Sequence, residues 1–196
     1  MKNPCKQALI AAAVSLSVAI PQFAFAEATT VTGVGALNAN ARVDFQITIP
    51  GVLRFRVGSP AAAIDMITFA PTSANLGTGA IGGTGGDLTG GTVTVDVLAN
   101  AGGDVTISQD SDGLSLVDGA GNAIPYTTIA TASSQPALGA PALGTAGTTT
   151  VFATGNLVQE SAEWTYTYAN DASYPSGIYG GTAANFGRVT YTASSP

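Results

Sequence analysis

The fold of this 196-residue chain is decided by the stretch Glu163-Trp164-Thr165-Tyr166-Thr167-Tyr168. Three large rings alternate there with polar residues, and a period of two is typical of a β-strand with one buried face. The same period returns near the end of the chain, in Arg188-Val189-Thr190-Tyr191-Thr192-Ala193. Aromatic side chains bury more apolar area than any others. We therefore predict that the first run is the central strand of a β-sandwich and that the second is its hairpin partner.

Further short strands are predicted upstream, where alternating or apolar runs are separated by turn residues. These strands are expected over residues 42–49, 53–57, 64–69, 92–97, 105–107, 114–117, 124–129 and 149–153. Two stretches rich in Gly, Thr and Ala, 71–91 and 130–147, are expected to be long loops. No capped amphipathic helix is predicted. The fold class is therefore all-β, an antiparallel two-sheet sandwich of immunoglobulin-like or jelly-roll type.

The predicted strand at 42–49 has the most regular alternation in the first third of the chain. Val43, Phe45, Ile47 and Ile49 are expected to face one way, and the polar residues between them the other. Pro50-Gly51 is expected to end the strand. Upstream of it, Val31, Val34 and Leu37 are the sizeable apolar residues of a segment otherwise rich in Ala, Thr, Gly and Asn, and they do not alternate.

The first residues have the pattern of a secretory signal peptide. Two lysines precede an apolar run, 8–20, and Ala24-Phe25-Ala26 offers a cleavage site between small residues. The apolar run is too short to span a bilayer. We predict a signal peptide over 1–26, a flexible N-terminal segment over 27–40 and a single sandwich domain over 41–196. Export to the periplasm, the cell surface or the extracellular space follows.

The composition after residue 26 excludes several kinds of function. Cys5 is the only cysteine and lies in the predicted signal peptide, and the chain has no histidine. Nucleophile–base pairs, zinc sites and disulfides that need these residues cannot be built. Four arginines stand against twelve acidic residues, a net charge of −8, which disfavours nucleic acid. The prediction is a protein that is not an enzyme, with no cofactor, no nucleic-acid partner and no membrane span.

Two motifs resemble a catalytic pair and a cofactor-binding loop, but we interpret both as having no such function. Glu160 and Glu163 are acids of the kind that hydrolyse sugars, but residues three apart on a strand point to opposite faces. The run from Gly77 to Gly82 matches the dinucleotide-binding pattern letter by letter. That pattern works only where a helix follows it, and none is predicted here.

A calcium site is one hypothesis for the Asp-rich turns. Asp110, Asp112 and Asp118 could offer carboxylate oxygens to the ion. The alternative is that Asp112-Gly113 and Asp118-Gly119 simply form tight hairpin turns. The sequence alone leaves both open.

A sugar site is a second hypothesis, located in the loop 171–187. Tyr174 and Tyr179 could stack on a pyranose ring while Asn185 supplies hydrogen bonds. Alternatively, these rings fold back and cap the core, as aromatic residues near sandwich corners do.

The end of the chain resembles the C-terminal strand of small secreted bacterial fibre subunits. The residues that carry the resemblance are Gly177-Ile178-Tyr179-Gly180-Gly181 and Gly187-Arg188-Val189-Thr190-Tyr191-Thr192-Ala193-Ser194-Ser195-Pro196. Chaperone–usher pilins and spore-coat-U-like proteins end in similar runs. The resemblance implies an immunoglobulin-like sandwich, passage through the periplasm and polymerisation by strand exchange.

The sequence thus favours an exported, non-enzymatic structural protein, a subunit of a cell-surface fibre or extracellular matrix. Its partners would be further copies of itself or other fibre subunits, with an assembly chaperone. The expected mechanism is strand addition at an open sheet edge. Residues 29–38, with Val31, Val34 and Leu37, are the candidate donor strand. The alternative is a secreted carbohydrate-binding module that binds a polysaccharide through Tyr174, Tyr179 and Asn185.

Overall fold

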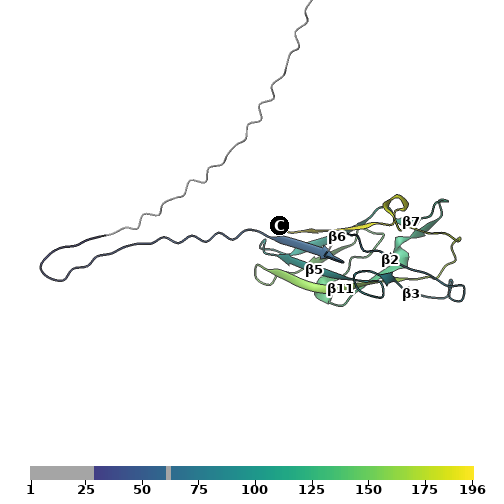
Figure 1. Ribbon diagram of the computed structural model, residues 1–196, viewed down its shortest axis with the longest axis horizontal. Helices are drawn as coiled ribbons and strands as arrows, with labels where there is room; N and C mark the ends of the chain where they lie inside the picture. Colours follow the sequence, from purple (N-terminus) through teal and green to yellow (C-terminus); the bar gives the residue numbers. More distant parts are fainter. Residues whose placement is uncertain (1–28, 61–62) are drawn as a thin grey trace, which may run out of the picture. The chain divides into compact units, whose positions relative to one another are not determined.

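The computed structural model describes residues 29–60 and 63–196 (Figure 1). The predicted signal peptide and Cys5 lie outside the described residues. The chain divides into two units, one that ends at Thr48 and one that runs from Ile49 to Pro196. In the first unit the described residues form neither helix nor strand. All strands belong to the second unit.

Two antiparallel sheets form the body of the second unit (Figure 1). The larger sheet has the order β1-β5-β11-β3, and β9 also pairs with β11. The smaller has the order β10-β6-β12. The strands of the larger sheet are β1 (Leu53–Val57), β3 (Ile81–Gly82), β5 (Thr92–Ala99), β9 (Ile129–Ser133) and β11 (Val158–Tyr168). Smaller-sheet bounds are β6 Val105–Ser111, β10 Thr148–Val151 and β12 Val189–Ser194.

Short elements complete the fold. Two small ladders are formed by β2 (Ile67–Thr68) with β4 (Thr84–Gly85) and by β7 (Ser115–Val117) with β8 (Ala123–Pro125). The helical elements of the described residues are three single 3₁₀ turns, η1 (Tyr126–Thr128), η2 (Pro136–Leu138) and η3 (Ala183–Asn185). No helix in this part of the chain is long and apolar enough to cross a membrane. The predicted all-β antiparallel fold is confirmed; its immunoglobulin-like or jelly-roll subtype stays a prediction.

The core lies between the two sheets and is centred on Trp164, which is fully buried. The indole N–H donates to the carbonyl oxygen of Leu138 at 3.0 Å, which satisfies the polar atom of this side chain. Tyr166 and Tyr168 point to the same side of β11 and are buried as predicted. The valines of β5 and β6 pack against them. The aromatic run therefore organises the core.

The predicted hairpin between the two alternating runs is wrong. β12 pairs with β6 in the smaller sheet, whereas β11 lies in the larger one. The reason is that β11 already has β5 and β3 on one edge and β9 on the other. The two runs meet across the core instead. Rings of Trp164 and Tyr191 lie 5.2 Å apart between centroids, and the hydroxyl oxygens of Tyr166 and Tyr191 are 2.8 Å apart.

Several further segments differ from the sequence prediction. The strand predicted over 42–49 does not form, and the one predicted over 124–129 is broken by η1, although Tyr126 is buried as expected. The run 64–69 keeps only β2, while the predicted loop 71–91 contains β3 and β4. The second predicted loop, 130–147, supplies Leu138 and Leu143 to the core. Isolated leucines in a Gly/Ala-rich stretch carry no period, so only tertiary packing reveals them.

Candidate functional site

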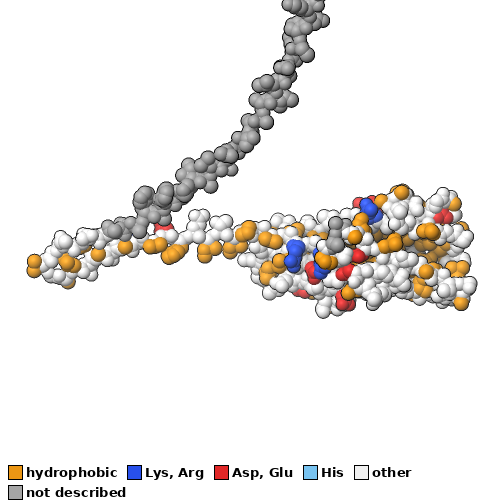
Figure 2. All heavy atoms as spheres, viewed as in Figure 1, with side chains coloured by type: hydrophobic (Ala, Val, Ile, Leu, Met, Phe, Trp, Pro, Cys, Tyr) orange, Lys and Arg blue, Asp and Glu red, His pale blue; other side chains and the backbone are white. Residues whose placement is uncertain are grey.

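The most unusual surface of the described chain is a row of unburied apolar side chains over residues 43–49, here named the apolar segment. Exposed fractions are 68% for Val43, 90% for Phe45, 86% for Ile47 and 75% for Ile49. Hydrophobic atoms are in full view along this segment in Figure 2. Four large apolar residues on alternate positions make a strand face without a core to cover it. A contiguous apolar surface of this kind indicates an interaction site.

A second unusual feature is the free edge of β12, which pairs only with β6 among the described strands. The Asp112 N–H donates to the Arg188 carbonyl oxygen at 3.1 Å, so these opposite residues form a hydrogen-bonded pair. Such pairs alternate along an antiparallel ladder. Val189, Tyr191 and Ala193 therefore direct their backbone N–H and C=O groups away from β6. These groups can accept one more strand.

The side chains of β12 also fit a strand that lacks one neighbour. On β6, the inward residues Val105 and Ile107 are fully buried. On β12, the inward residues Val189, Tyr191 and Ala193 are only half-buried, although they pack against the core. β12 itself contains no charged residue and no proline. Natural edge strands are usually protected by such residues, so this edge is open to pairing.

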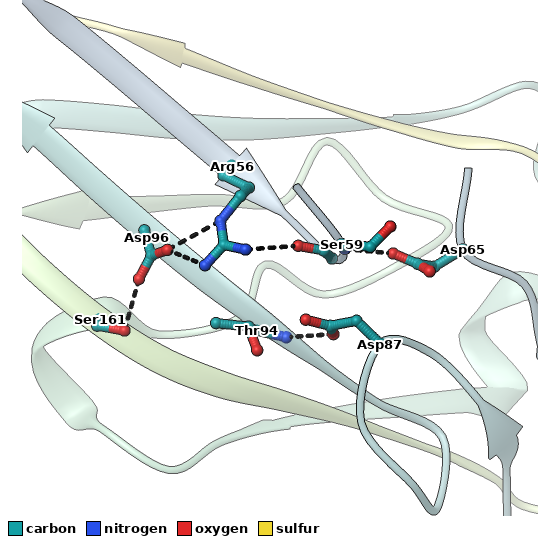
Figure 3. Close-up of polar contacts among 8 residues, drawn as sticks. Arg56, Ser59, Asp65, Asp87, Thr94, Asp96 and Ser161 are labelled. Carbon is teal, nitrogen blue, oxygen red and sulfur yellow. Dashed lines mark hydrogen bonds and ion pairs between the residues drawn. The ribbon is translucent and has the colours of Figure 1, made fainter. Parts of the chain in front are cut away.

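The edge formed by β1 differs because it is charged. Arg54 and Arg56 lie on its outer face, and Arg56 pairs with Asp96 of β5 (Figure 3). Ser161 of β11 donates to the same carboxylate at 2.6 Å. The hydrogen bond from Ser161, followed by that from Arg56, lowers the pKa of Asp96. These contacts tie β1, β5 and β11 together, and the charged side chains make the β1 edge less open to pairing than the β12 edge.

The other edge of the smaller sheet, formed by β10, is partly covered. It packs against η2. The Gln109 N–H of β6 donates to the Gly147 carbonyl oxygen at 3.2 Å and so continues the ladder between β6 and β10. β10 is also shorter than β12. Among the edges of the smaller sheet, β12 is therefore the longer and the more open.

Of the three aspartates considered as calcium ligands, Asp118 is used in a turn. The Asp118 carboxylate accepts hydrogen bonds from the Ala120 and Asn122 N–H groups and from the Asn122 side chain, at 2.8–2.9 Å. The Asn122 side chain is the main cause of the lowered pKa of Asp118. Asp110 lies on β6, and Asp112 follows it. Within residues 29–60 and 63–196, no three Asp, Glu, His or Cys residues form a group able to hold a metal ion.

The structure brings the predicted sugar-binding tyrosines together. The rings of Tyr174 and Tyr179 meet edge to face, with centroids 6.4 Å apart. Both side chains are half-buried, and the Tyr179 hydroxyl donates to the Pro175 carbonyl oxygen at 2.8 Å. Asn185 donates to the Gly180 carbonyl oxygen at 3.4 Å. Two rings that meet edge to face do not form a flat platform for a sugar. The Tyr179 hydroxyl and the Asn185 side chain are already hydrogen-bonded within the loop.

The glycine-rich run predicted to be a chance match is part of a loop fixed by Asn170. This fully buried side chain accepts from the Gly77 N–H at 3.2 Å and donates to the carbonyl oxygens of Asn75 and Gly79 at 2.6 and 3.0 Å. The run ends in β3, not in a helix. The run therefore lacks the helix N-terminus that holds a pyrophosphate.

The two glutamates considered as an acid/base pair point to opposite faces of β11, as expected. Glu163 is exposed and borders an open hollow of about 860 Å³, which residues 84–90 and Thr92 also line. Glu160 has the inward parity of Ala162 and Trp164. Asp87 also lines the hollow, but its carboxylate accepts the Thr94 N–H at 2.7 Å (Figure 3). The hollow contains no aromatic residue and does not bring the two glutamates together.

Comparison with family models, with curated proteins and with solved structures found no match. Function must therefore be argued from the chain's own residues. The alternation in 43–49 is evident in the sequence and predicts a strand of the sandwich there. The pattern of 188–193 does not show that β12 is an edge strand. A clue was available in the equal spacing of the two patterns. Both runs alternate apolar and polar residues with a period of two, as two neighbouring strands of one sheet do.

Proposed function

We propose that this chain is an exported, non-enzymatic structural protein, a subunit that builds a cell-surface fibre or an extracellular matrix by β-strand addition. One observation carries the proposal: the apolar segment has the pattern of a half-buried strand but forms no strand and leaves its large apolar side chains exposed. In water this row of side chains is unfavourable, because burying each of them is worth about 1.5–3 kcal/mol. A second copy of the chain can supply the missing neighbour. Export rests on the predicted signal peptide over 1–26.

The free edge of β12 in the second copy is the acceptor that we propose. Strand addition there would give the outward backbone groups of Val189, Tyr191 and Ala193 partners and would cover their half-buried side chains. Residues opposite one another in a sheet share a face. Phe45 and Ile47 would then lie beside Tyr191 over the core, and the polar residues between them would lie beside threonines on the solvent side.

The segment 29–38, predicted from the sequence as the donor, has a less suitable pattern. Val31, Val34 and Leu37 are 40%, 109% and 50% exposed, so they too are available for contacts. Their spacing of three, however, places successive side chains on opposite faces of an extended strand. Only the apolar segment can direct all its large residues toward one core. We therefore propose 43–49 as the donor and keep 29–38 as the comparison.

The test is the assembly state of the full chain recovered from the periplasm, measured by size-exclusion chromatography and negative-stain microscopy. Three variants are compared with it: a deletion of 43–48, a deletion of 29–38 and Ala193→Pro. The proline removes an outward N–H of β12 and leaves the ladder to β6 intact. We expect oligomers or filaments for the full chain and for the 29–38 deletion. The other two variants should give folded monomers, as judged by circular dichroism.

Assembly that survives the deletion of 43–48 would refute this donor. If the 29–38 deletion is the one that abolishes assembly, the donor is the upstream segment. A full chain that stays monomeric at all concentrations, with or without an assembly chaperone, would refute the structural role itself.

A carbohydrate-binding module is the second candidate, and the close pair Tyr174–Tyr179 is the observation that favours it. Both rings are only half-buried, so part of each is exposed to solvent. A monomeric full chain that is retained on a polysaccharide column, and that loses retention in Tyr179→Ala with the fold unchanged, would establish this alternative.

A further inference from the structure

The residues that lead into β1, 50–52, are hydrogen-bonded to Asn100, the residue that follows β5. Its Oδ1 accepts the Val52 N–H at 2.6 Å, and its Nδ2 donates to the Pro50 carbonyl oxygen at 2.9 Å. Its own backbone N–H donates to the Val52 carbonyl oxygen at 3.1 Å. The side-chain amide of Asn100 therefore continues the β1–β5 ladder past its end and holds residues 50–52 in line with β1.

The hydrogen bonds of the Asn100 side chain, here named the clamp, occupy the backbone N–H that a β-turn at Pro50-Gly51 would need. In a β-turn over 49–52, the Val52 N–H would donate to the Ile49 carbonyl oxygen. Here that N–H is bonded to Asn100. A type II turn would also require a positive φ at Gly51, and Gly51 does not have one. The sequence has the residues of a turn, and the structure does not form it.

Register shows what such a turn would do. A two-residue hairpin loop at 50–51 would set Ile47 opposite Arg54 and direct the apolar segment to solvent, because opposite residues share a face. Only a loop of three residues, 50–52, sets Ile47 opposite Phe55 on the core side. That loop needs a left-handed backbone at its third residue, where the β-branched Val52 is unfavourable.

We propose that Asn100 is a positioning residue that prevents the apolar segment from pairing with β1 of its own copy and so keeps it available for a second copy. The inference rests on the proposed function for its consequence, but the conformational part stands alone. Asn100 and Val52 act together. The Asn100 side chain occupies the backbone N–H of Val52, and the β-branched side chain of Val52 disfavours the three-residue loop that could otherwise form. Removing both frees the segment to close on β1 in cis.

The experiment measures this closure directly by disulfide formation in the full chain. Thr48→Cys and Arg54→Cys, with Cys5→Ser, place two thiols opposite each other on the solvent side of the three-residue-loop hairpin. A disulfide requires Cα atoms within about 7 Å of each other. Closure is read as the fraction of intramolecular disulfide in a glutathione buffer, at a concentration low enough for monomers. It is compared in the parent and in N100A, V52G, N100A/V52G and N100D/V52G.

We expect little intramolecular disulfide in the parent, where Val52 also disfavours the loop, and about thirtyfold more closure in N100A/V52G than in V52G, the ratio that the two hydrogen bonds of the Asn100 side chain supply. N100D/V52G should close less than N100A/V52G, because aspartate keeps the acceptor for the Val52 N–H although it loses the donor to the Pro50 carbonyl oxygen. This rescue separates a clamp from general loss of structure. Equal disulfide in V52G and N100A/V52G, or none in either, would overturn the inference. The readout uses monomers, so it stands or falls independently of whether the chain polymerises.

Discussion

Replacing Phe45 by alanine separates the two states that the proposal requires. In the monomer the ring is 90% exposed, so the substitution removes almost no contact. Surface changes of this kind alter the free energy of unfolding by about 0.5 kcal/mol or less. In the assembly the same ring would cover the core beside Tyr191, and truncating a buried aromatic anchor costs about 2–4 kcal/mol. The dissociation constant between copies should therefore rise about 30- to 1,000-fold.

The assay combines two measurements on the same preparations. Urea unfolding under monomeric conditions gives the stability of the domain, and a dilution series followed by analytical ultracentrifugation gives the association constant. Gln46→Ala is the matched control, because its side chain lies on the polar face of the same segment. It should leave both quantities nearly unchanged. A stability loss above about 1.5 kcal/mol in the Phe45→Ala monomer would show that the ring is packed within its own copy, since such losses come from buried contacts. Unchanged association would refute the proposed interface.

Two further predictions concern the sandwich itself. Burial raises the pKa of Tyr166 to about 12, from an ordinary value of 10. Its contribution to stability is complete below pH 10 and is lost as the pH rises toward 12, by about 1 kcal/mol per pH unit, because the unfolded state ionises first. Urea midpoints measured from pH 9 to 12 should fall less steeply in Tyr166→Phe, and an equal slope would contradict this assignment. Asn170→Ala should destabilise the domain by about 2–4 kcal/mol, since it leaves buried backbone groups of the 75–79 loop without partners and places alanine at a φ of 47°. Asn170→Gly, which tolerates this backbone, should lose less, and equal losses would show that the backbone conformation does not contribute.

Most of the strands could be predicted because their pattern is local. Val93, Val95 and Val97 have the period of a strand, and β5 buries all three. The aromatic alternation in 163–168 likewise predicted which face of β11 is buried. Turn residues such as Asp118-Gly119 marked the ends of short strands. In each case the information lies within a few consecutive residues, which is the range over which strand periodicity operates.

What remained unpredictable was the choice of partner. The pattern of 188–193 is that of a strand, but it does not say whether the neighbour is β11 or β6. The pattern of 42–49 is equally clear, yet the described fold contains no strand there. Leu138 and Leu143 had no pattern at all. Pairing depends on which edges are already occupied, and that is a property of the whole sheet rather than of the strand.

The sequence by itself determined the chemistry and the strand faces: a chain with no histidine, a single cysteine at position 5, and apolar residues on alternate positions. Only the tertiary structure decided that β12 keeps one free edge and that Asn100 holds the entrance to β1. It also decided that the most regular apolar strand face of the N-terminal region has no core of its own. The physical reason is that periodicity fixes which face of a strand is apolar, whereas the cover for that face depends on residues distant in sequence, or on another molecule.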